Sequence, residues 1–282
     1  MKKHFILGIL FLILIISSCK DITTKTMDTN EAQTLLTESV TAYSIFASTQ
    51  EETTIKSAEA ENNLKSATIT TDNYPIVSVD PLDLTSWPKT ITINYGPDNI
   101  TGWDGVERRG TIIVYATNFP GFENATWQIT FDEFYHNDYL VEGTQTITYK
   151  GLNESENPYY TCKVEDGMIT SPEGKAFHFE QSTVREWVGG HETPLNLCDD
   201  DYQITGEHSG ISSDGYTYSV TTKEPLLLNL CCRYIEDGKL NVELQDANLN
   251  CEIDYRPGND TGELCNDLAA FNIFGNTITV HL

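Results

Sequence analysis

Acidic and amide side chains gather in two loops of similar sequence, residues 93–102 and 253–262. Each loop runs from isoleucine through a tyrosine and a proline to Thr-Gly, and an aspartate follows a few residues later. Calcium binds six to eight oxygen atoms, and the aspartates that could supply some of them are Asp98, Asp104, Asp260 and Asp267. The residue order is not that of an EF-hand loop, and Asp and Asn beside Gly and Pro also favour turns. We therefore expect structural turns with Tyr95 and Tyr255 buried, and keep a calcium site as the alternative.

The familiar catalytic motifs are missing from the chain. Residues 210–215, Gly-Ile-Ser-Ser-Asp-Gly, lack the Gly-x-Ser-x-Gly spacing of a nucleophile elbow. The lysines after Gly174 and Gly238 precede Ala and Leu rather than the Ser or Thr of a phosphate-binding loop. No His-Glu-x-x-His pattern occurs, and the histidines are scattered, including His136, His178, His191 and His208. The sequence predicts no catalytic residue and no cofactor, although sequence spacing does not reveal a glycosidase carboxylate pair.

Cysteine usage indicates an oxidising compartment. One of the seven cysteines lies near the N-terminus, and the other six are Cys162, Cys198, Cys231, Cys232, Cys251 and Cys265. Six cysteines permit three disulfides in any of 15 pairings, and we expect at least two. A disulfide is favoured over a thiol–histidine dyad for Cys162. Adjacent residues on a strand point to opposite faces, so either Cys231 or Cys232 can instead be a buried apolar residue.

The first eighteen residues are typical of a secretory signal peptide. Lys2 and Lys3 precede an apolar run over residues 5–16, which is shorter than the ~20 residues that a membrane-spanning helix needs. The next residues, Ile-Ser-Ser-Cys19, resemble the lipobox of bacterial lipoproteins. That resemblance implies cleavage before Cys19 and attachment of acyl chains such as palmitate to this cysteine. Two or three acyl chains give stable membrane anchoring, so we expect an outer-membrane lipoprotein.

Two residues after the lipobox indicate which face of the outer membrane the protein occupies. Lys20 and Asp21 partly resemble the signal that exports some Bacteroidota lipoproteins to the cell surface. The match is partial because a single acidic residue is followed by Ile22 and Thr23. We expect exposure at the cell surface in preference to the periplasmic face.

The charge and composition of the chain limit the classes of molecule that it can bind. The chain has a formal net charge of −25, and losing Lys2 and Lys3 with the signal peptide makes it −27. Such a surface excludes nucleic acid, whose binding depends on lysine and arginine, and an acidic surface favours solubility. The 4 tryptophans and 14 tyrosines suit either a carbohydrate-binding face or a β core. We expect a membrane-anchored binding or structural module with a carbohydrate or protein ligand, and a glycan-acting hydrolase of the cell envelope as the alternative.

Residues 19–75 differ in composition from the rest and are expected to form a lipidated tether. Residues 28–46 have a helical pattern, with Asp28 or Thr29 as the N-cap, and residues 51–73 are polar and linker-like. The simplest interpretation is a stalk that lifts the domain off the membrane. In the alternative, the helix packs on the domain or on a partner.

Residues 76–282 show the period-two pattern of antiparallel strands. Leu240, Val242 and Leu244 alternate with polar residues, as expected for strands with one buried face. Dipeptides suited to tight hairpins occur at Asp166-Gly167, Asp214-Gly215, Asp237-Gly238 and Gly275-Asn276. We predict an all-β meander of hairpins, as a sandwich or an open barrel-like sheet. The repeated loops suggest two related β units, about 85–190 and 191–282.

Four motifs together resemble a family of uncharacterised lipoproteins from Bacteroidota over residues 85–282. They are the Asn-Tyr-Gly-Pro loop followed by Arg-Arg-Gly at 108–110, the segments 137–144 and 201–206, and the later Asp-Tyr pair at 254–255. The resemblance implies a secreted β-rich domain and supplies no activity. Members often carry a cysteine where this chain has Trp103, which implies that Cys265 lacks a partner.

The lipidation prediction is tested by Cys19→Ala. Without the thiol no acyl chain is attached, so the variant should lose lipid labelling and move to the soluble fraction. Metabolic labelling with a fatty-acid analogue and cell fractionation measure both effects. A variant that stays labelled and membrane-bound would contradict the lipoprotein assignment.

Overall fold

The computed structural model describes residues 26–66, 74–83, 85–193, 196–232, 234–257 and 265–281. The signal peptide, the lipidation candidate Cys19 and the metal candidate Asp260 lie outside these ranges. Among the described residues, no helix is both long and apolar enough to cross a membrane.

The described strands form one antiparallel sheet in which each strand pairs with the next along the chain. This arrangement confirms the predicted meander, and the sheet is open rather than a sandwich. Two short 3-10 helices lie between strands: η1 (Leu197–Asp199) precedes β8, and η2 (Gln245–Ala247) follows β10. The thirteen strands are β1 (Ile76–Asp80), β2 (Lys89–Thr101), β3 (Glu107–Ala116), β4 (Thr126–His136), β5 (Tyr139–Leu152), β6 (Pro158–Thr170), β7 (Ala176–Gly189), β8 (Asp201–Ile211), β9 (Thr217–Asn229), β10 (Asp237–Leu244), β11 (Leu249–Asp254), β12 (Leu268–Ile273) and β13 (Asn276–His281).

Local alternation of side chains explains the strands. In β10, Leu240, Val242 and Leu244 are buried while Asn241 and Glu243 are exposed. The same alternation recurs in the neighbouring strands, so the sheet presents one continuous apolar face. The expected boundary between two units at 190/191 falls between β7 and β8, which pair within this same sheet.

Two of the four predicted hairpin turns are correct. Asp214-Gly215 joins β8 to β9, and Gly275 lies in the turn between β12 and β13. Asp166-Gly167 and Asp237-Gly238 instead lie inside β6 and β10, at breaks in the strand register. A β-bulge also uses residues with positive φ, and Asp166 (φ 54°) and Gly238 (φ 112°) supply it. The dipeptides therefore predicted the backbone conformation correctly but the wrong structural context.

The helix α1 (Thr29–Ser66) is longer than the predicted helix over residues 28–46. Asp28 caps it, because its Oδ1 accepts hydrogen bonds from the backbone N–H groups of Asn30 and Glu31, at 2.8 and 2.9 Å. The Glu31 side chain accepts a return bond from the Asp28 N–H at 2.8 Å, which completes a capping box. The prediction of a linker over residues 51–73 is wrong for residues 51–66, because these residues continue the helix.

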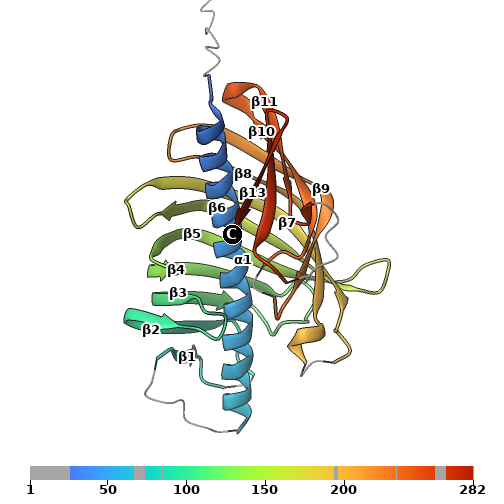
Figure 1. Ribbon diagram of the computed structural model, residues 1–282. Coiled ribbons are helices and arrows are strands. Elements are labelled where there is room, and N and C mark those ends of the chain that lie inside the picture. Colours follow the sequence, from blue (N-terminus) through green and yellow to red (C-terminus); the bar gives the residue numbers. More distant parts are fainter. Residues whose placement is uncertain are drawn as a thin grey trace, which may run out of the picture.

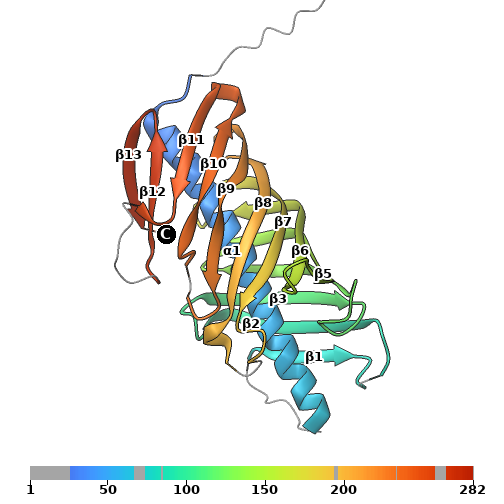
Figure 2. The same cartoon turned by 90° about the vertical axis from the view of Figure 1, so that its right-hand side faces the viewer.

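The sheet curls around α1, which lies along its concave face (Figures 1 and 2). The helix contacts β1 and β2 at one end of the strand order and β12 near the other. Leu35, Leu36 and Phe46 are fully buried, and the ring of Phe46 stacks on Phe179 of β7 at 5.5 Å between centroids. The stalk interpretation is therefore wrong, and the alternative, a helix packed on the domain, is correct. An open sheet with an apolar concave face needs such a covering element.

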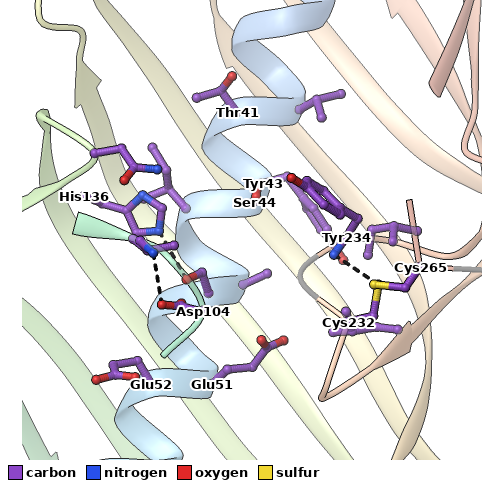
Figure 3. A pocket seen from close by; sticks show the side chains of 18 of the residues that line it. Thr41, Tyr43, Ser44, Glu51, Glu52, Asp104, His136, Cys232, Tyr234 and Cys265 are labelled. Carbon is purple, nitrogen blue, oxygen red and sulfur yellow. Dashed lines mark hydrogen bonds between the residues drawn. A yellow bond between two sulfur atoms is a disulfide. The ribbon is translucent and has the colours of Figure 1, made fainter. Parts of the chain in front are cut away.

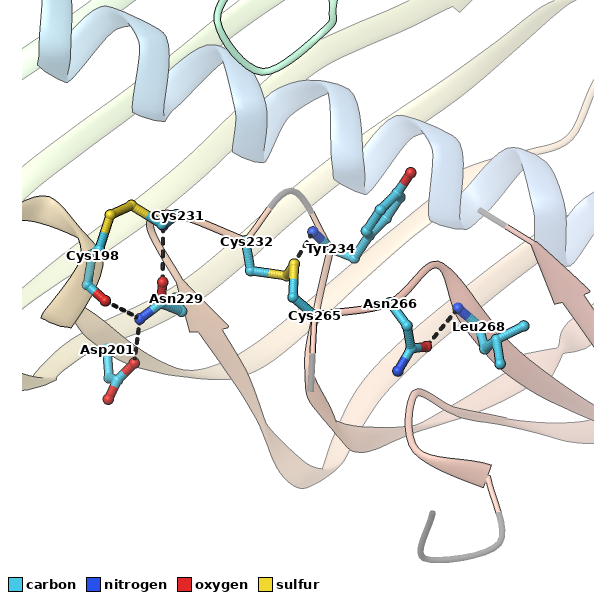
Figure 4. Close-up of a disulfide and its surroundings, with 9 residues drawn as sticks. All are labelled: Cys198, Asp201, Asn229, Cys231, Cys232, Tyr234, Cys265, Asn266 and Leu268. Carbon is cyan, nitrogen blue, oxygen red and sulfur yellow. Dashed lines mark hydrogen bonds between the residues drawn. A yellow bond between two sulfur atoms is a disulfide. The ribbon is translucent and has the colours of Figure 1, made fainter. Parts of the chain in front are cut away.

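Two disulfides hold the C-terminal strands, Cys198–Cys231 and Cys232–Cys265 (Figure 4). The prediction of at least two disulfides is confirmed. Cys231 and Cys232 lie in the connection between β9 and β10 rather than on a strand, so their sulfur atoms can diverge to different partners. The expectation that Cys265 lacks a partner is wrong. So is the disulfide predicted for Cys162, which is a free, buried thiol.

The burial of α1 is tested by Phe46→Ala. Truncating a fully buried phenylalanine leaves a cavity and typically costs about 3–5 kcal/mol of unfolding free energy. The control is Phe122→Ala, because Phe122 is 56% exposed in the connection between β3 and β4, and its loss should change stability by about 0.5 kcal/mol or less. Urea unfolding followed by tryptophan fluorescence measures both. Equal effects of the two substitutions would contradict a core position for the helix.

Candidate functional site

A cavity of about 510 Å³ lies over α1. Three parts of the chain line it: the helix, the turns after β2 and β4, and the C-terminal segments (Figure 3). The turns contribute Trp103, Asp104, Val106, His136, Asn137 and Tyr139. Segments far apart in sequence therefore meet at this cavity because the sheet curls back on the helix.

Small hydroxyl side chains of α1 form part of the cavity floor. Thr37, Thr41, Ser44 and Ser48 follow one another at intervals of four, three and four residues and all line the cavity. Residues at this spacing share one face of a helix, and Thr37 and Ser44 are exposed. The opposite face carries the large apolar residues that pack on the sheet. The small residues on the exposed side leave space above the helix.

The disulfide-bonded connection between β9 and β10 forms the facing wall. Cys231, Cys232 and Cys265 line the cavity together with Tyr234 and Ile235. A disulfide restricts the unfolded chain and typically contributes about 2–4 kcal/mol. The two bridges therefore hold in place a wall that contains little regular secondary structure.

A second cavity of about 370 Å³ adjoins the first along the helix. Glu51 and Leu230 line both cavities, so the two are neighbours. Four aromatic side chains among the described residues line the second cavity: Trp127, Tyr149, Tyr160 and Tyr202. From Thr37 to Glu59 the two cavities follow roughly 33 Å of helix at 1.5 Å per residue.

Polar side chains beneath the first cavity are held by an arginine. Arg108 of β3 is fully buried, and its two terminal nitrogens donate to the Asp104 carboxylate at 2.9 and 2.6 Å. The same guanidinium donates to Ser48 of α1 at 3.0 Å, and His136 Nε2 lies 3.1 Å from that hydroxyl. Burial by itself would raise the pKa of the Asp104 carboxyl. The hydrogen bonds from Arg108 and its positive charge have the larger combined effect, so the pKa of Asp104 lies below its usual value. Asp104 is therefore a carboxylate held in a fixed position.

The two glutamates of the cavity also have partners on the sheet. The Tyr95 hydroxyl donates to Glu52 Oε1 at 2.8 Å, and burial, together with the Glu52 charge, raises the pKa of Tyr95. Arg185 of β7 donates to Glu51 Oε1 at 3.3 Å. Burial raises the pKa of Glu51 even though Arg185 opposes the shift. Each contact ties a helix side chain to a strand that is distant in sequence.

The three described candidates for calcium ligands do not form a common site. Asp98 is exposed near the end of β2, Asp104 is paired with Arg108, and Asp267 lies 2.9 Å from the His281 ring nitrogen. Within the described ranges, none of these three belongs to a group of three or more potential ligands. Tyr95 and Tyr255 are both buried, as the structural interpretation of the loops predicts.

Sequence reasoning missed Glu51 and Arg185. Glu51 was assigned to the linker, although it lies in the middle of α1. The position of Arg185 could have been predicted from the sequence. Every second residue of β7 from Phe177 to Arg185 is buried, so Arg185 falls in that series. An arginine at a core position of an alternating strand indicates a buried charge that needs a partner.

The pH dependence of stability should reveal His208, a core residue of β8. His208 is 5% exposed and its Nε2 lies 3.0 Å from Ser39 Oγ of α1. Burial lowers the pKa of His208 from 6.5 to about 3. The unfolded chain therefore binds a proton at pH values where the folded protein does not, and unfolding free energy should fall by about 1.4 kcal/mol per pH unit below pH 6.5.

Substitution of His208 by Gln should remove this part of the pH dependence. The control is His178→Gln, which changes an exposed histidine of β7 and should leave the slope unaltered. Urea unfolding at several pH values between about 7 and about 5 measures the slope. A His208→Gln variant with the wild-type slope would show that another group carries the effect.

Comparison of the chain with protein-family models, with curated protein sequences and with solved structures gave no match, so its geometry alone supports a functional assignment.

Proposed function

We propose that this domain is the ligand-binding part of a membrane-anchored lipoprotein, and that its ligand lies along α1 in the two adjoining cavities. The observation that carries the proposal is the 510 Å³ cavity between the helix and the disulfide-held wall. Ligand sites typically measure about 300–1,000 Å³ and combine apolar walls with a few polar groups. Both cavities fall within that range.

The lining of the first cavity suits a largely apolar molecule. Val40, Ile45, Leu228 and Ile235 contribute apolar surface, and Trp103 in the same lining is 61% exposed. An exposed tryptophan beside a cavity offers a flat apolar surface to an entering ligand.

One polar group of the lining lacks a partner. The Tyr255 hydroxyl makes no hydrogen bond within the described part of the chain, but it is fully enclosed by protein and is not offered to a ligand. The polar groups that a ligand can reach are therefore the hydroxyl side chains of the helix, such as Thr37 and Ser44, which line the cavity and are exposed.

The same geometry favours binding over hydrolysis. A glycosidase needs two carboxyl groups that meet the substrate and, in the inverting case, a water molecule. Each carboxylate among the described residues that line the first cavity is instead engaged by the protein: Glu51 by Arg185, Glu52 by Tyr95 and Asp104 by Arg108. A glycan-acting hydrolase of the cell envelope stays the alternative, and release of product from an envelope glycan would favour it.

The packing of α1 also sets the distance to the proposed anchor. Because the helix begins at Thr29 and belongs to the domain, the tether shortens from residues 19–75 to residues 19–28. Ten residues span at most roughly 35 Å when fully extended. A domain lipidated at Cys19 would therefore remain close to the membrane, and we retain the cell surface as the favoured side.

The proposal is tested by filling the cavity. Ser44 is exposed on α1 and lines the first cavity, so Ser44→Trp should occupy the space without disturbing the buried face of the helix. Nile red, a neutral dye that fluoresces in apolar sites, should bind the wild-type protein saturably. Its affinity should fall by about tenfold in the variant, a change of about 1.4 kcal/mol.

The matched control is Thr221→Trp, which places the same ring on an exposed position of β9 that lines neither cavity. This control should keep the wild-type affinity, and both variants should keep the wild-type circular dichroism. Equal dye binding by all three proteins, or no binding to any of them, would refute the proposed site.

A further inference from the structure

We infer that the second cavity binds the carboxylate of an organic acid with an apolar body, and that Arg185 receives this carboxylate in exchange for Glu51. The inference rests on the proposed binding function and specifies the chemistry of the ligand. It also assigns a role in ligand binding to a buried arginine of β7.

Arg185 has unused hydrogen-bonding capacity. It is 4% exposed, and its single hydrogen bond to another described residue is the 3.3 Å contact with Glu51. Its Nε is buried without a partner. A guanidinium carries five N–H donors in a planar fork that matches a carboxylate. One long contact therefore leaves most of this fork unsatisfied.

The other buried arginine shows what a purely structural guanidinium looks like in this fold. Arg108 makes three hydrogen bonds, two to Asp104 and one to Ser48, and lines neither cavity. Its Nε is buried without a partner, as is that of Arg185, so the two arginines differ at their terminal nitrogens. Arg185 makes one hydrogen bond and lines the second cavity. The contrast indicates that Arg185 is held ready for a group that enters the cavity.

Aromatic rings fix the guanidinium and line the cavity. Arg185 lies over the ring of Tyr202 at 4.3 Å from its centroid, and Trp187 stacks on the same ring at 5.6 Å. Such stacking fixes the guanidinium plane. Trp127 and Ile147 contribute the apolar surface for the body of the ligand. The cavity thus combines one cation with apolar walls.

The charges in the lining favour a single anionic group. Arg185 is the only lysine or arginine among the described residues that line the second cavity. Of the two carboxylates there, Glu59 is exposed and pairs with Lys56 at 3.0 Å, so Glu51 is the one that competes for Arg185. An entering carboxylate therefore competes with Glu51 for the charge of Arg185, and in the exchange that we infer it takes the place of Glu51.

The position of Glu51 allows its side chain to leave Arg185. It lines both cavities, so its side chain can turn from the second cavity toward the first. Burial raises the pKa of Glu51, which favours uptake of a proton when its contact with Arg185 is lost. The exchange then keeps the net charge around Arg185 unchanged.

The test compares an acid with its neutral ester. The probes are cis-parinaric acid, a fluorescent fatty acid, and its methyl ester, which has the same chain but no charge. The wild-type protein should bind the acid about tenfold more tightly than the ester, since hydrogen bonds between charged groups are the stronger ones. Arg185→Met keeps the volume of the side chain and should bring the two affinities together.

Arg109→Met is the matched control. Arg109 also stacks on a tyrosine, Tyr135, and pairs with an aspartate, Asp138, but lines neither cavity. This variant should retain the wild-type preference for the acid. An unchanged preference in Arg185→Met would overturn the inference.

Glu51→Gln tests the exchange without removing the arginine. It removes the competing carboxylate, so the acid should bind more tightly and raise the melting temperature more than in the wild-type protein. Weaker binding of the acid by this variant would overturn the exchange, even if Arg185→Met does not fold. Equal binding of acid and ester by the wild-type protein would refute the inference alone, whereas failure of both probes to bind would refute the proposed function as well.

Discussion

The burial of α1 in the concave face of the sheet is the interaction on which the rest of this structure depends. A meander of thirteen described strands that does not close leaves an apolar face that would otherwise meet water. Residues of both partners, such as Leu36 and Phe46 of the helix and Ile129 and Phe179 of the sheet, are fully buried. Burying a side chain of this size contributes about 1.5–3 kcal/mol. The helix therefore completes the hydrophobic core.

Polar contacts then fix where the helix lies along the sheet. A purely apolar interface would tolerate sliding, but a buried polar group costs free energy unless it is hydrogen-bonded. Ser39 meets His208, Glu52 accepts from Tyr95, and the Gln145 side chain donates to the Phe46 carbonyl at 3.1 Å. These contacts join the helix to strands from β2 to β8, so any shift of the helix would break several of them together.

The same constraint produces the cavities. The sheet encloses one face of the helix tightly, while small residues such as Ser44 and the disulfide-held connection before β10 leave space over the other. The pair formed by Glu51 and Arg185 lies where the two cavities meet. Packing of the helix thus positions the polar groups that our proposals assign to ligand binding.

The sequence by itself determined the local features of this protein. The sequence predicted the alternation along β10, the turn at Asp214-Gly215, a helix N-cap at Asp28 or Thr29, and the burial of Tyr95 and Tyr255. Such features follow from periodicity and backbone preferences, which can be read from one chain. The lipidation of Cys19 also rests on a local motif and stays a prediction.

Only the tertiary structure decided which distant residues meet. Residues 51–66 are too polar to look like a buried helix, yet they continue α1, and Glu51 and Glu52 at the start of this segment have partners on the sheet. The disulfide partners are separated by 33 residues, and Glu51 and Arg185 by 134. Such pairs depend on how the curled sheet encloses the helix. No local pattern encodes that curvature, because it is the sum of strand twist, bulges and packing over the whole sheet.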